Sequence, residues 1–194
     1  MRFTEIEHKF VVDEAFDLLA FGRMLEDLRP VRTSAVQVRD RYFLTEAGRS
    51  RQFVIRHRFD VELHQLTLKS LNADPQVRDE ITIALDRGDG DQAAAIDAFI
   101  ARMGVVWTGT IEKSVTVWYF ADCEVVHYVA SSGDTVVRCV EFEAIDQANV
   151  ADALAVLDRY EQATGFAPAS RSVSSLVDLL FSGVLSQKLS GMPT

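Results

Sequence analysis

The sequence predicts an α+β fold in which antiparallel strands curl into a closed barrel and helices pack outside it. Three observations support this prediction. Strand-like segments follow one another through short turns, helical segments stand between groups of strands, and several strands carry charged residues at every second position. The chain has 194 residues, 48% of them apolar and 25% charged, which is enough for one domain with a core.

The strands are indicated by runs of alternating apolar and polar residues between turn-forming pieces. Such runs are expected at residues 3–12, 35–44, 52–59, 63–70, 77–85, 110–120, 123–130 and 135–144. The segments EAGRS (46–50) and LNADPQ (71–76) are expected to be turns, and SSGD (131–134) a hairpin turn. Because short turns join successive strands, the sheet is expected to be antiparallel.

Four segments have helical spacing of apolar residues or helix-favouring composition. They lie at about 13–28, 91–103, 146–165 and 172–186. Asp13 is expected to cap the first helix, and Pro30 follows its end. Gly104 and Gly165 are expected to close the second and third.

Composition excludes several classes of function. The net charge of −9 argues against a general nucleic-acid binder, which needs a basic surface to neutralise phosphates. No run approaches the ~18 apolar residues of a membrane helix, and the N-terminal residues lack the layout of a signal peptide, so we expect a cytoplasmic protein without a membrane partner. The two cysteines, Cys123 and Cys139, match no metal-ligand spacing and are expected to be reduced.

The charged residues of the strands share faces, because side chains alternate along a strand. In the first strand Glu5, Glu7 and Lys9 lie on one face, with Ile6 opposite. The same alternation recurs in four further strands, at Arg56 and Arg58, at Thr67 and Lys69, at Arg78, Glu80 and Thr82, and at Glu141 and Glu143. A merely solvated face would also use Ser, Asn and Gln freely. We therefore expect these faces to line a water-filled barrel lumen.

Such a lumen favours a metal-chelated polyphosphate as its ligand. Arg and Lys bind phosphate oxygens, and Arg offers a bidentate fork. Clustered glutamates would repel phosphate unless a cation stood between them, and their hard oxygen atoms suit Mg²⁺ or Mn²⁺. The sequence thus predicts a metal-chelated polyphosphate as ligand and Mg²⁺ or Mn²⁺ as cofactor.

Several motifs resemble those of the CYTH domain, or triphosphate tunnel metalloenzyme, a family that includes class IV adenylyl cyclases, thiamine triphosphatases and tripolyphosphatases. Glu5, Glu7 and Lys9 match its E-x-E-x-K signature. The motifs that follow in order are RDRYFLT (39–45), IRHR (55–58), LTLKS (66–70), VRDE (77–80), IEK (111–113) and VEFE (140–143). The resemblance spans roughly residues 3–180. It implies an eight-stranded antiparallel tunnel, which forms one domain over residues 1–185. Residues 186–194, which follow the last expected helix, are expected to be a flexible tail.

The resemblance also implies roles for individual residues. The residues that would bind phosphate are Lys9, Arg56, Arg58, Lys69, Arg78, Lys113 and Arg171. Those that would hold the metal are Glu5, Glu7, Glu141 and Glu143, with His127 as a further candidate. Lys9, Glu80 and Tyr42 are the candidates for direct participation in catalysis, Tyr42 as a hydroxyl that lines the tunnel.

Three positions depart from the family pattern and leave the function open. Val115 stands where a second basic residue is usual, Thr82 where a second glutamate is common, and His127 where an aspartate is expected. We expect hydrolysis of the terminal phosphoryl group of a small triphosphate, with inorganic tripolyphosphate preferred. The alternatives are a class IV-type adenylyl cyclase that makes cAMP from ATP, a non-catalytic module that binds nucleotide or polyphosphate, and a barrel that binds protein. The sequence leaves open whether the protein is a monomer or a homodimer.

Overall fold

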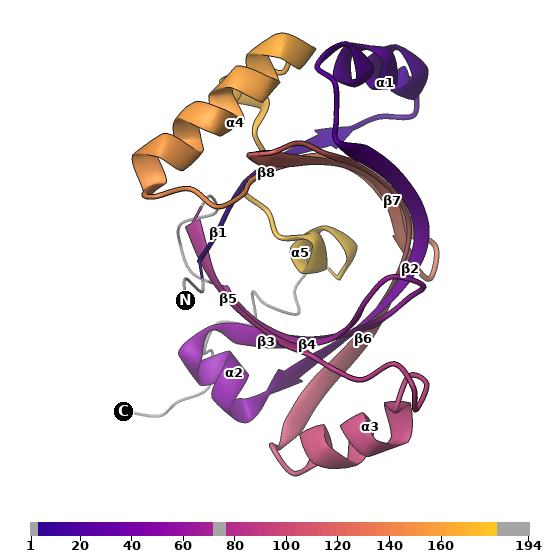
Figure 1. Cartoon of the computed structure of the whole chain (residues 1–194). Coiled ribbons are helices and arrows are strands. Elements are labelled where there is room, and N and C mark those ends of the chain that lie inside the picture. The colour runs from indigo at the N-terminus through magenta and orange to yellow at the C-terminus, as the bar shows by residue number, and fades with distance from the viewer. Residues whose placement is uncertain (1–3, 72–76, 182–194) are drawn as a thin grey trace.

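The computed structural model describes residues 4–71 and 77–181, and these contain a closed barrel of eight antiparallel strands, as predicted (Figure 1). The strands are β1 (Thr4–Val12), β2 (Arg32–Thr45), β3 (Phe53–Phe59), β4 (His64–Ser70), β5 (Val77–Ala84), β6 (Val105–Tyr119), β7 (Cys123–Ser132) and β8 (Thr135–Ala144). Their order around the barrel is β1-β5-β4-β3-β2-β6-β7-β8. The predicted antiparallel pairing is therefore confirmed at every junction.

Strand β1 closes the barrel because it pairs with two neighbours in succession. Its first residues, Thr4 to Ile6, pair with β5, and the stretch from Glu7 to Val12 pairs with β8. Because side chains alternate along the strand, one face of β1 points into the lumen and the other toward the outer helices. This arrangement places Glu5, Glu7 and Lys9 inside the barrel.

The helices are α1 (Leu18–Asp27), α2 (Glu46–Arg51), α3 (Ala93–Ala101), α4 (Val150–Thr164) and α5 (Leu176–Leu180), with a short 3₁₀ turn at Pro168–Ser170. No helix in the described part of the chain is long and apolar enough to span a membrane. Gly165 ends α4 as predicted, with φ of 79°, a left-handed conformation that glycine adopts without strain.

Two local predictions were wrong. The first helix begins later than expected because Asp17, not Asp13, caps it, accepting a hydrogen bond of 2.8 Å from the backbone N–H of Ala20. The segment EAGRS forms helix α2 instead of a turn. The side chain of Thr45 caps this helix by accepting a hydrogen bond of 2.9 Å from the backbone N–H of Gly48.

The outer face of the barrel is apolar where helices cover it. Helices α1 and α4 lie on one side of the ring, and α2 and α3 lie on the other (Figure 1). Under α1 and α4, Phe10 and Phe142 are buried together with Leu157 of α4. Phe10 alternates along β1, and Phe142 along β8, with the charged residues of the lumen. The same period-2 pattern therefore places apolar side chains in the core and charged side chains in the lumen.

Helix α5 packs against the inner wall of the barrel. Its residues Leu176, Val177 and Leu180 form a buried cluster with side chains that face the lumen, including Tyr42 and Tyr128. Figure 1 shows α5 within the outline of the ring. The helix predicted at 172–186 is therefore present only at Leu176–Leu180 within the described residues. Its continuation beyond residue 181 and the tail predicted at 186–194 lie outside them.

Candidate active site

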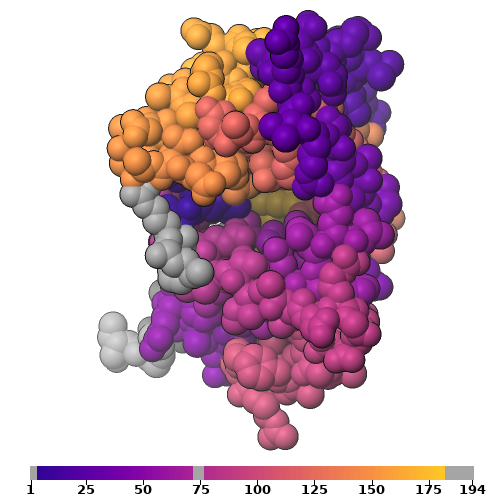
Figure 2. All heavy atoms as spheres, in the orientation of Figure 1, coloured from indigo at the N-terminus to yellow at the C-terminus, as the bar shows by residue number. Residues whose placement is uncertain are grey.

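The barrel encloses a cavity of about 480 Å³, a size within the range of small-molecule sites. Figure 2 shows the face where the surface is hollowed, with α5 visible inside the opening, and residues Leu176 and Val177 of α5 line the cavity. The predicted site residues that line it are Glu5, Glu7, Lys9, Tyr42, Arg56, Arg58, Lys69, Arg78, Glu80, Lys113, Glu141 and Glu143. The structure thus brings together side chains from β1, β2, β3, β4, β5, β6 and β8.

Carboxylates gather where β1, β8 and β7 run side by side. Glu7 is paired in register with Glu143, and Glu143 with Glu124, while Glu5 lies two residues before Glu7 on the same face. Within residues 4–71 and 77–181, no basic side chain makes an ion pair with Glu143. Burial, together with the charges of Glu5 and Glu7, raises the pKa of Glu143 well above its ordinary value. This acidic cluster, formed by Glu5, Glu7, Glu124 and Glu143, is short of positive charge.

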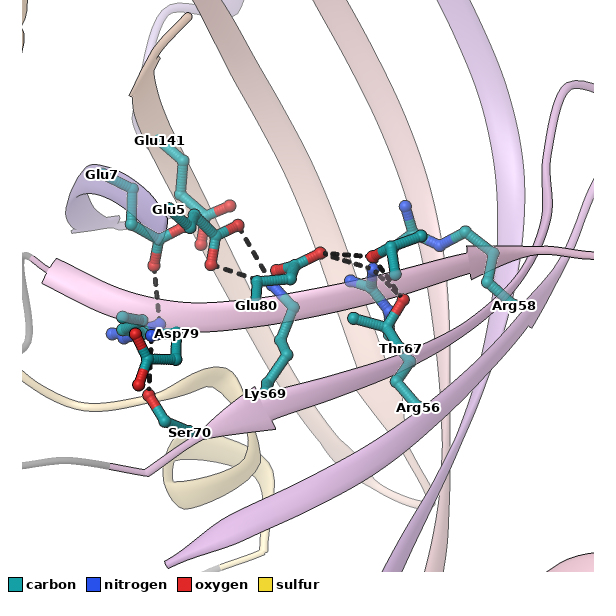
Figure 3. Close-up of polar contacts among 12 residues, drawn as sticks. Glu5, Glu7, Arg56, Arg58, Thr67, Lys69, Ser70, Asp79, Glu80 and Glu141 are labelled. Atoms are coloured by element: carbon teal, nitrogen blue, oxygen red, sulfur yellow. Dashed lines mark hydrogen bonds and ion pairs between the residues drawn. The ribbon is translucent and has the colours of Figure 1, made fainter. Parts of the chain in front are cut away.

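Lys69 lies between two of the lumen carboxylates (Figure 3). Its Nζ is 3.1 Å from both carboxylate oxygens of Glu5 and 2.5 Å from Oε2 of Glu80. Burial, together with the charges of Glu7 and Glu80, raises the pKa of Glu5 to about 7 against the opposing charge of Lys69. Burial would raise the pKa of Glu80 too, but Lys69 and Arg56 outweigh it and lower this pKa to about 2.

A second group of ion pairs joins β1, β5 and β8. Arg78 donates from Nη1 to Oε1 of Glu7 over 2.7 Å. Lys9 lies 3.0 Å from Oε1 of Glu141 and 3.4 Å from Glu7, and the hydroxyl of Tyr128 donates to Glu141 over 2.7 Å. Although burial would raise the pKa of Glu141, Lys9 and this hydrogen bond lower it to about 2. Glu141 is thus held as an anion by its neighbours.

The third group is centred on Asp40, a residue that the sequence analysis did not single out. Arg58 donates a bidentate pair of hydrogen bonds to its carboxylate, from Nε over 2.7 Å and from Nη2 over 2.8 Å. Lys113 Nζ lies 2.6 Å from Oδ2 of the same residue. Burial would raise the pKa of Asp40, but Lys113 and Arg58 hold it far below its ordinary value.

These contacts determine how an anion can bind. Each predicted phosphate-binding cation that lines the described lumen has a carboxylate within ion-pair distance: Lys9, Arg56, Arg58, Lys69, Arg78 and Lys113. A phosphate must therefore compete with these carboxylates. A divalent cation bound to Glu5 and Glu7 would reduce that competition, because it would release Arg78 from Glu7 and leave Lys69 with Glu80 as its one carboxylate partner.

The donor set fits a hard divalent cation. The acidic cluster offers only carboxylate oxygens, the ligands that Mg²⁺ and Mn²⁺ prefer. Its member Glu143 has no basic partner among the described residues, so a bound cation would satisfy a charge that the protein leaves uncompensated. Glu5, Glu7 and Glu143 are therefore the side chains best placed to hold the metal. Glu141 is already bound to Lys9 and Tyr128.

Sequence reasoning missed Asp60, Glu62 and Glu124, which line the cavity, and Asp40, which pairs with the lining residues Arg58 and Lys113. Asp40 precedes Tyr42 by two residues in RDRYFLT, so the predicted inward position of Tyr42 implied that Asp40 also faces inward. Glu124 precedes Tyr128 by four residues and lies on the same face of β7. That strand lacks an alternating run of charges, so its sequence did not indicate which face is internal.

The structure does not place His127 with the other predicted metal ligands. Its ring packs outside the lumen in a stacked arrangement with Phe16, with 5.8 Å between the ring centroids. The neighbours of His127 on either side, Val126 and Tyr128, are the ones that line the cavity. Because alternate residues of a strand face opposite sides, His127 cannot join the glutamates in the lumen.

Arg171 is also outside the lumen, contrary to its predicted contact with substrate. It donates from Nη2 to Glu161 over 2.6 Å and to Asp158 over 2.5 Å, both on α4. His8 lies against the same Glu161, with 2.5 Å between Nδ1 and Oε1. His8, Asp158 and Glu161 are close enough to share a metal ion, but the guanidinium of Arg171 already supplies a positive charge to both carboxylates.

One wall of the cavity is apolar. Val36 and Val38 of β2, Val115 and Val117 of β6, and Val126 of β7 all line it. Val115 therefore faces the lumen, at the position where the family resemblance implies a basic residue. These valines offer no charge to a phosphate, so the phosphate contacts must come from the rest of the lining, which includes Lys113 nearer the start of β6.

No protein-family model matches the chain, and no curated protein sequence matches it. Solved structures do match. The PH1012 protein of Pyrococcus horikoshii is 17% identical, with 91% of this chain and 99% of that chain covered and a TM-score of 0.72. A protein of Vibrio parahaemolyticus, named as a proposed adenylate cyclase, is 15% identical, with 92% and 98% covered and a TM-score of 0.64.

A third match is HpAC1 from Hippeastrum, a proposed adenylyl cyclase described as having a dominant triphosphatase activity. It is 16% identical, with 88% of this chain and 91% of that chain covered and a TM-score of 0.54. At these identities the likeness concerns the fold, and it extends over almost the whole chain. Together with the closed barrel and its charged lumen, it shows that this chain has the CYTH, or triphosphate tunnel, fold.

Proposed function

We propose that this protein is a divalent-metal-dependent hydrolase that releases the terminal phosphoryl group of a small triphosphate, with inorganic tripolyphosphate as the preferred substrate. The proposal rests on the way acidic and basic side chains are distributed over the lumen. The carboxylates of the acidic cluster come from β1, β7 and β8, and most phosphate-binding cations come from β3, β4 and β5. A metal-chelated phosphate chain needs both kinds of side chain at once.

The roles of the side chains follow from this geometry. Glu5, Glu7 and Glu143 would hold Mg²⁺ or Mn²⁺, and a metal bound there supplies positive charge to the reacting phosphate and lowers the pKa of a water molecule. Arg56 of β3 and Arg78 of β5 line the cavity on either side of β4 and would bind phosphate oxygens. Phosphoryl transfer asks mainly for positioning and charge stabilisation, which such side chains provide.

The three residues predicted to take part in catalysis have distinct surroundings. Lys9 lies between Glu7 and Glu141, and only 4% of its surface is exposed, so it would orient carboxylates as well as phosphate. Glu80 holds Lys69 and Arg56. Tyr42 belongs to the buried cluster around α5, so we propose that it shapes the part of the cavity beside α5.

A substrate panel tests the proposal. Tripolyphosphate, ATP and thiamine triphosphate are each incubated with the protein and Mg²⁺ or Mn²⁺, and the release of phosphate, pyrophosphate and cAMP is measured. Hydrolysis predicts phosphate as the product, fastest from tripolyphosphate. Formation of cAMP and pyrophosphate from ATP would favour a cyclase, the alternative suggested by the names of the Vibrio and Hippeastrum proteins, although a dominant triphosphatase activity is described for the latter.

A non-catalytic binding module is the second candidate. Two observations favour it: the valine wall around Val115 contributes no charge, and every predicted cation of the described lumen is already ion-paired. A module of this kind would bind tripolyphosphate in calorimetry with Mg²⁺ present, and the panel would detect no product. Absence of both binding and turnover would contradict both candidates.

Arg56→Ala is expected to weaken tripolyphosphate binding by about 10- to 100-fold, the usual effect of losing a charge-assisted hydrogen bond. Arg56 is suited to this role because its side chain lines the cavity and its contact with Glu80, at 3.5 Å, is longer than the ion pairs of the other predicted phosphate-binding cations of the described lumen. Calorimetric titration measures the change. The control is Arg39→Ala, which removes an exposed arginine on the face of β2 that points away from the lumen. Equal affinities for the two variants would remove Arg56 from the phosphate site.

A further inference from the structure

Asp40 differs from the other carboxylates of the lumen. Its exposed fraction is 0%, and its two oxygens accept from Arg58 on β3 and lie against Lys113 on β6. Strand β2, which carries Asp40, stands opposite β1 in the barrel order. Asp40 is therefore on the wall opposite Glu5 and Glu7, and its contacts with Arg58 and Lys113 keep it from serving as a metal ligand.

Each of the two cations bound to Asp40 is held by specific contacts. The guanidinium of Arg58 is fixed by two hydrogen bonds in the bidentate geometry that defines its plane. Lys113, with a side chain that is 8% exposed, is fixed by its 2.6 Å contact with Oδ2 and by the ring of Tyr128, 5.6 Å away. Two cations and one anion leave this group with a net charge of +1.

We propose that Asp40 is a positioning residue that holds Arg58 and Lys113 as one oriented pair of cations for a phosphate group. The inference rests on the function proposed above and assigns it a residue that touches neither the substrate nor the metal. Without the shared anion, the two cations would repel each other and regain rotational freedom. With it, both face the lumen before the substrate arrives, so the reaction does not have to orient them.

The variant Asp40→Asn distinguishes the orientation of Arg58 and Lys113 from the affinity for tripolyphosphate. Asparagine has nearly the same shape, but it removes the negative charge that holds the pair and makes the lumen more positive by one unit. Tripolyphosphate is therefore expected to bind at least as tightly as to the wild type, while kcat falls by about 10- to 100-fold because the cations lose their alignment. Calorimetry gives the affinity, and phosphate release with Mg²⁺ gives kcat.

The matched control is Asp122→Asn. Asp122 also pairs with an arginine, accepting from Arg159 over 2.6 Å and from Tyr160 over 2.9 Å, but on the outer surface beside α4. This variant should keep the kcat of the wild type. A kcat for Asp40→Asn equal to that of the control would overturn the inference. So would a lower melting temperature accompanied by parallel loss of binding, because that pattern indicates a structural role.

A second measurement is available if Asp40→Asn does not fold. Arg58→Gln and Lys113→Met each leave Asp40 with one cation, and their double variant completes a cycle. If Asp40 joins the two cations into one unit, the loss of kcat in the double variant will differ by at least about 5-fold from the product of the single losses. Multiplicative losses would overturn the inference. A wild-type protein that neither binds nor hydrolyses tripolyphosphate would instead remove the proposed function, and this inference with it.

Discussion

Glu143→Gln is expected to abolish the metal-dependent release of phosphate while making the metal-free protein more stable. Activity is lost because Glu143, like Glu124, has no basic partner among residues 4–71 and 77–181, and Glu143 also lies in register beside both Glu7 and Glu124, where it can share a cation with them. We expect a fall in kcat of about 100-fold or more, since loss of even a supporting contact to a metal costs 10- to 100-fold.

The metal-free Glu143→Gln protein is expected to be more stable for the same reason, namely that Glu143 has no basic partner within the described residues. The raised pKa of Glu143 arises from burial and from the charges of Glu5 and Glu7, so its ionised form is disfavoured in the folded protein. Glutamine keeps the shape and removes the repulsion. We expect the melting temperature of the metal-free protein to rise by about 3 °C, which corresponds to about 1 kcal/mol in a chain of this length. Thermal unfolding in the presence of a chelator measures it.

The pH dependence gives a second readout of the acidic cluster. The folded protein holds protons on Glu5, whose pKa is raised from 4.5 to about 7, and on Glu143, whereas the unfolded chain has already released them. The folded state thus binds more protons, and its stability without metal should fall as pH rises from 4.5 to about 7. Glu143→Gln should flatten this slope.

The control for both measurements is Glu112→Gln, which changes an exposed glutamate on the outer face of β6. It is expected to leave the rate of phosphate release and the pH slope unchanged. An active Glu143→Gln variant would remove Glu143 from the metal site. An unchanged melting temperature would mean that the repulsion within the acidic cluster is relieved by other means than protonation.

The sequence predicted the lumen well where a strand carries charges at every second residue. In β1, β3, β5 and β8 the period-2 pattern identified the inward face, and the structure places Glu7, Arg56 and Glu141 in the cavity. Strand β7 has no such pattern, so a position taken from the family resemblance led to His127, and the inward-facing Glu124 was overlooked. The limit is physical: a strand that is apolar on both faces does not reveal which face is internal.

Tertiary contacts account for the other differences. Strand β6 begins at Val105, five residues before the predicted start, because its first residues pair with the end of β2, where Val105 lies opposite Thr45. Arg171 lies in the connection between α4 and α5, and its position depends on Glu161 of α4. No local pattern specifies either contact, since both join segments that are distant in the sequence or lack regular structure.

Lys69→Met is expected to destabilise the protein strongly at neutral pH. The Nζ of Lys69 lies within 3.1 Å of Glu5 and 2.5 Å of Glu80, so the substitution leaves two partly buried carboxylates without their shared cation. Breaking a buried ion pair from one side costs about 3–5 kcal/mol. For a chain of this length that corresponds to a fall in melting temperature of about 10 °C. Arg159→Met is the control, because Arg159 pairs with Asp122 on the surface, where an ion pair contributes about 1 kcal/mol at most.

The pH dependence of this loss distinguishes charge from packing. Without Lys69, the pKa of Glu5, which burial already raises, rises further, and the pKa of Glu80 loses the main contact that lowers it. Protonation therefore stabilises the variant relative to the wild type, and the variant is weakened as pH increases. The loss of stability of the Lys69→Met variant relative to the wild type should therefore be small at pH 5 and large at pH 8. Mg²⁺ should reduce this loss by supplying the missing positive charge. A deficit of equal size at both pH values would show that Lys69 stabilises the barrel through the packing of its methylene groups, and the ion-pair network of the lumen would then lose its central contact.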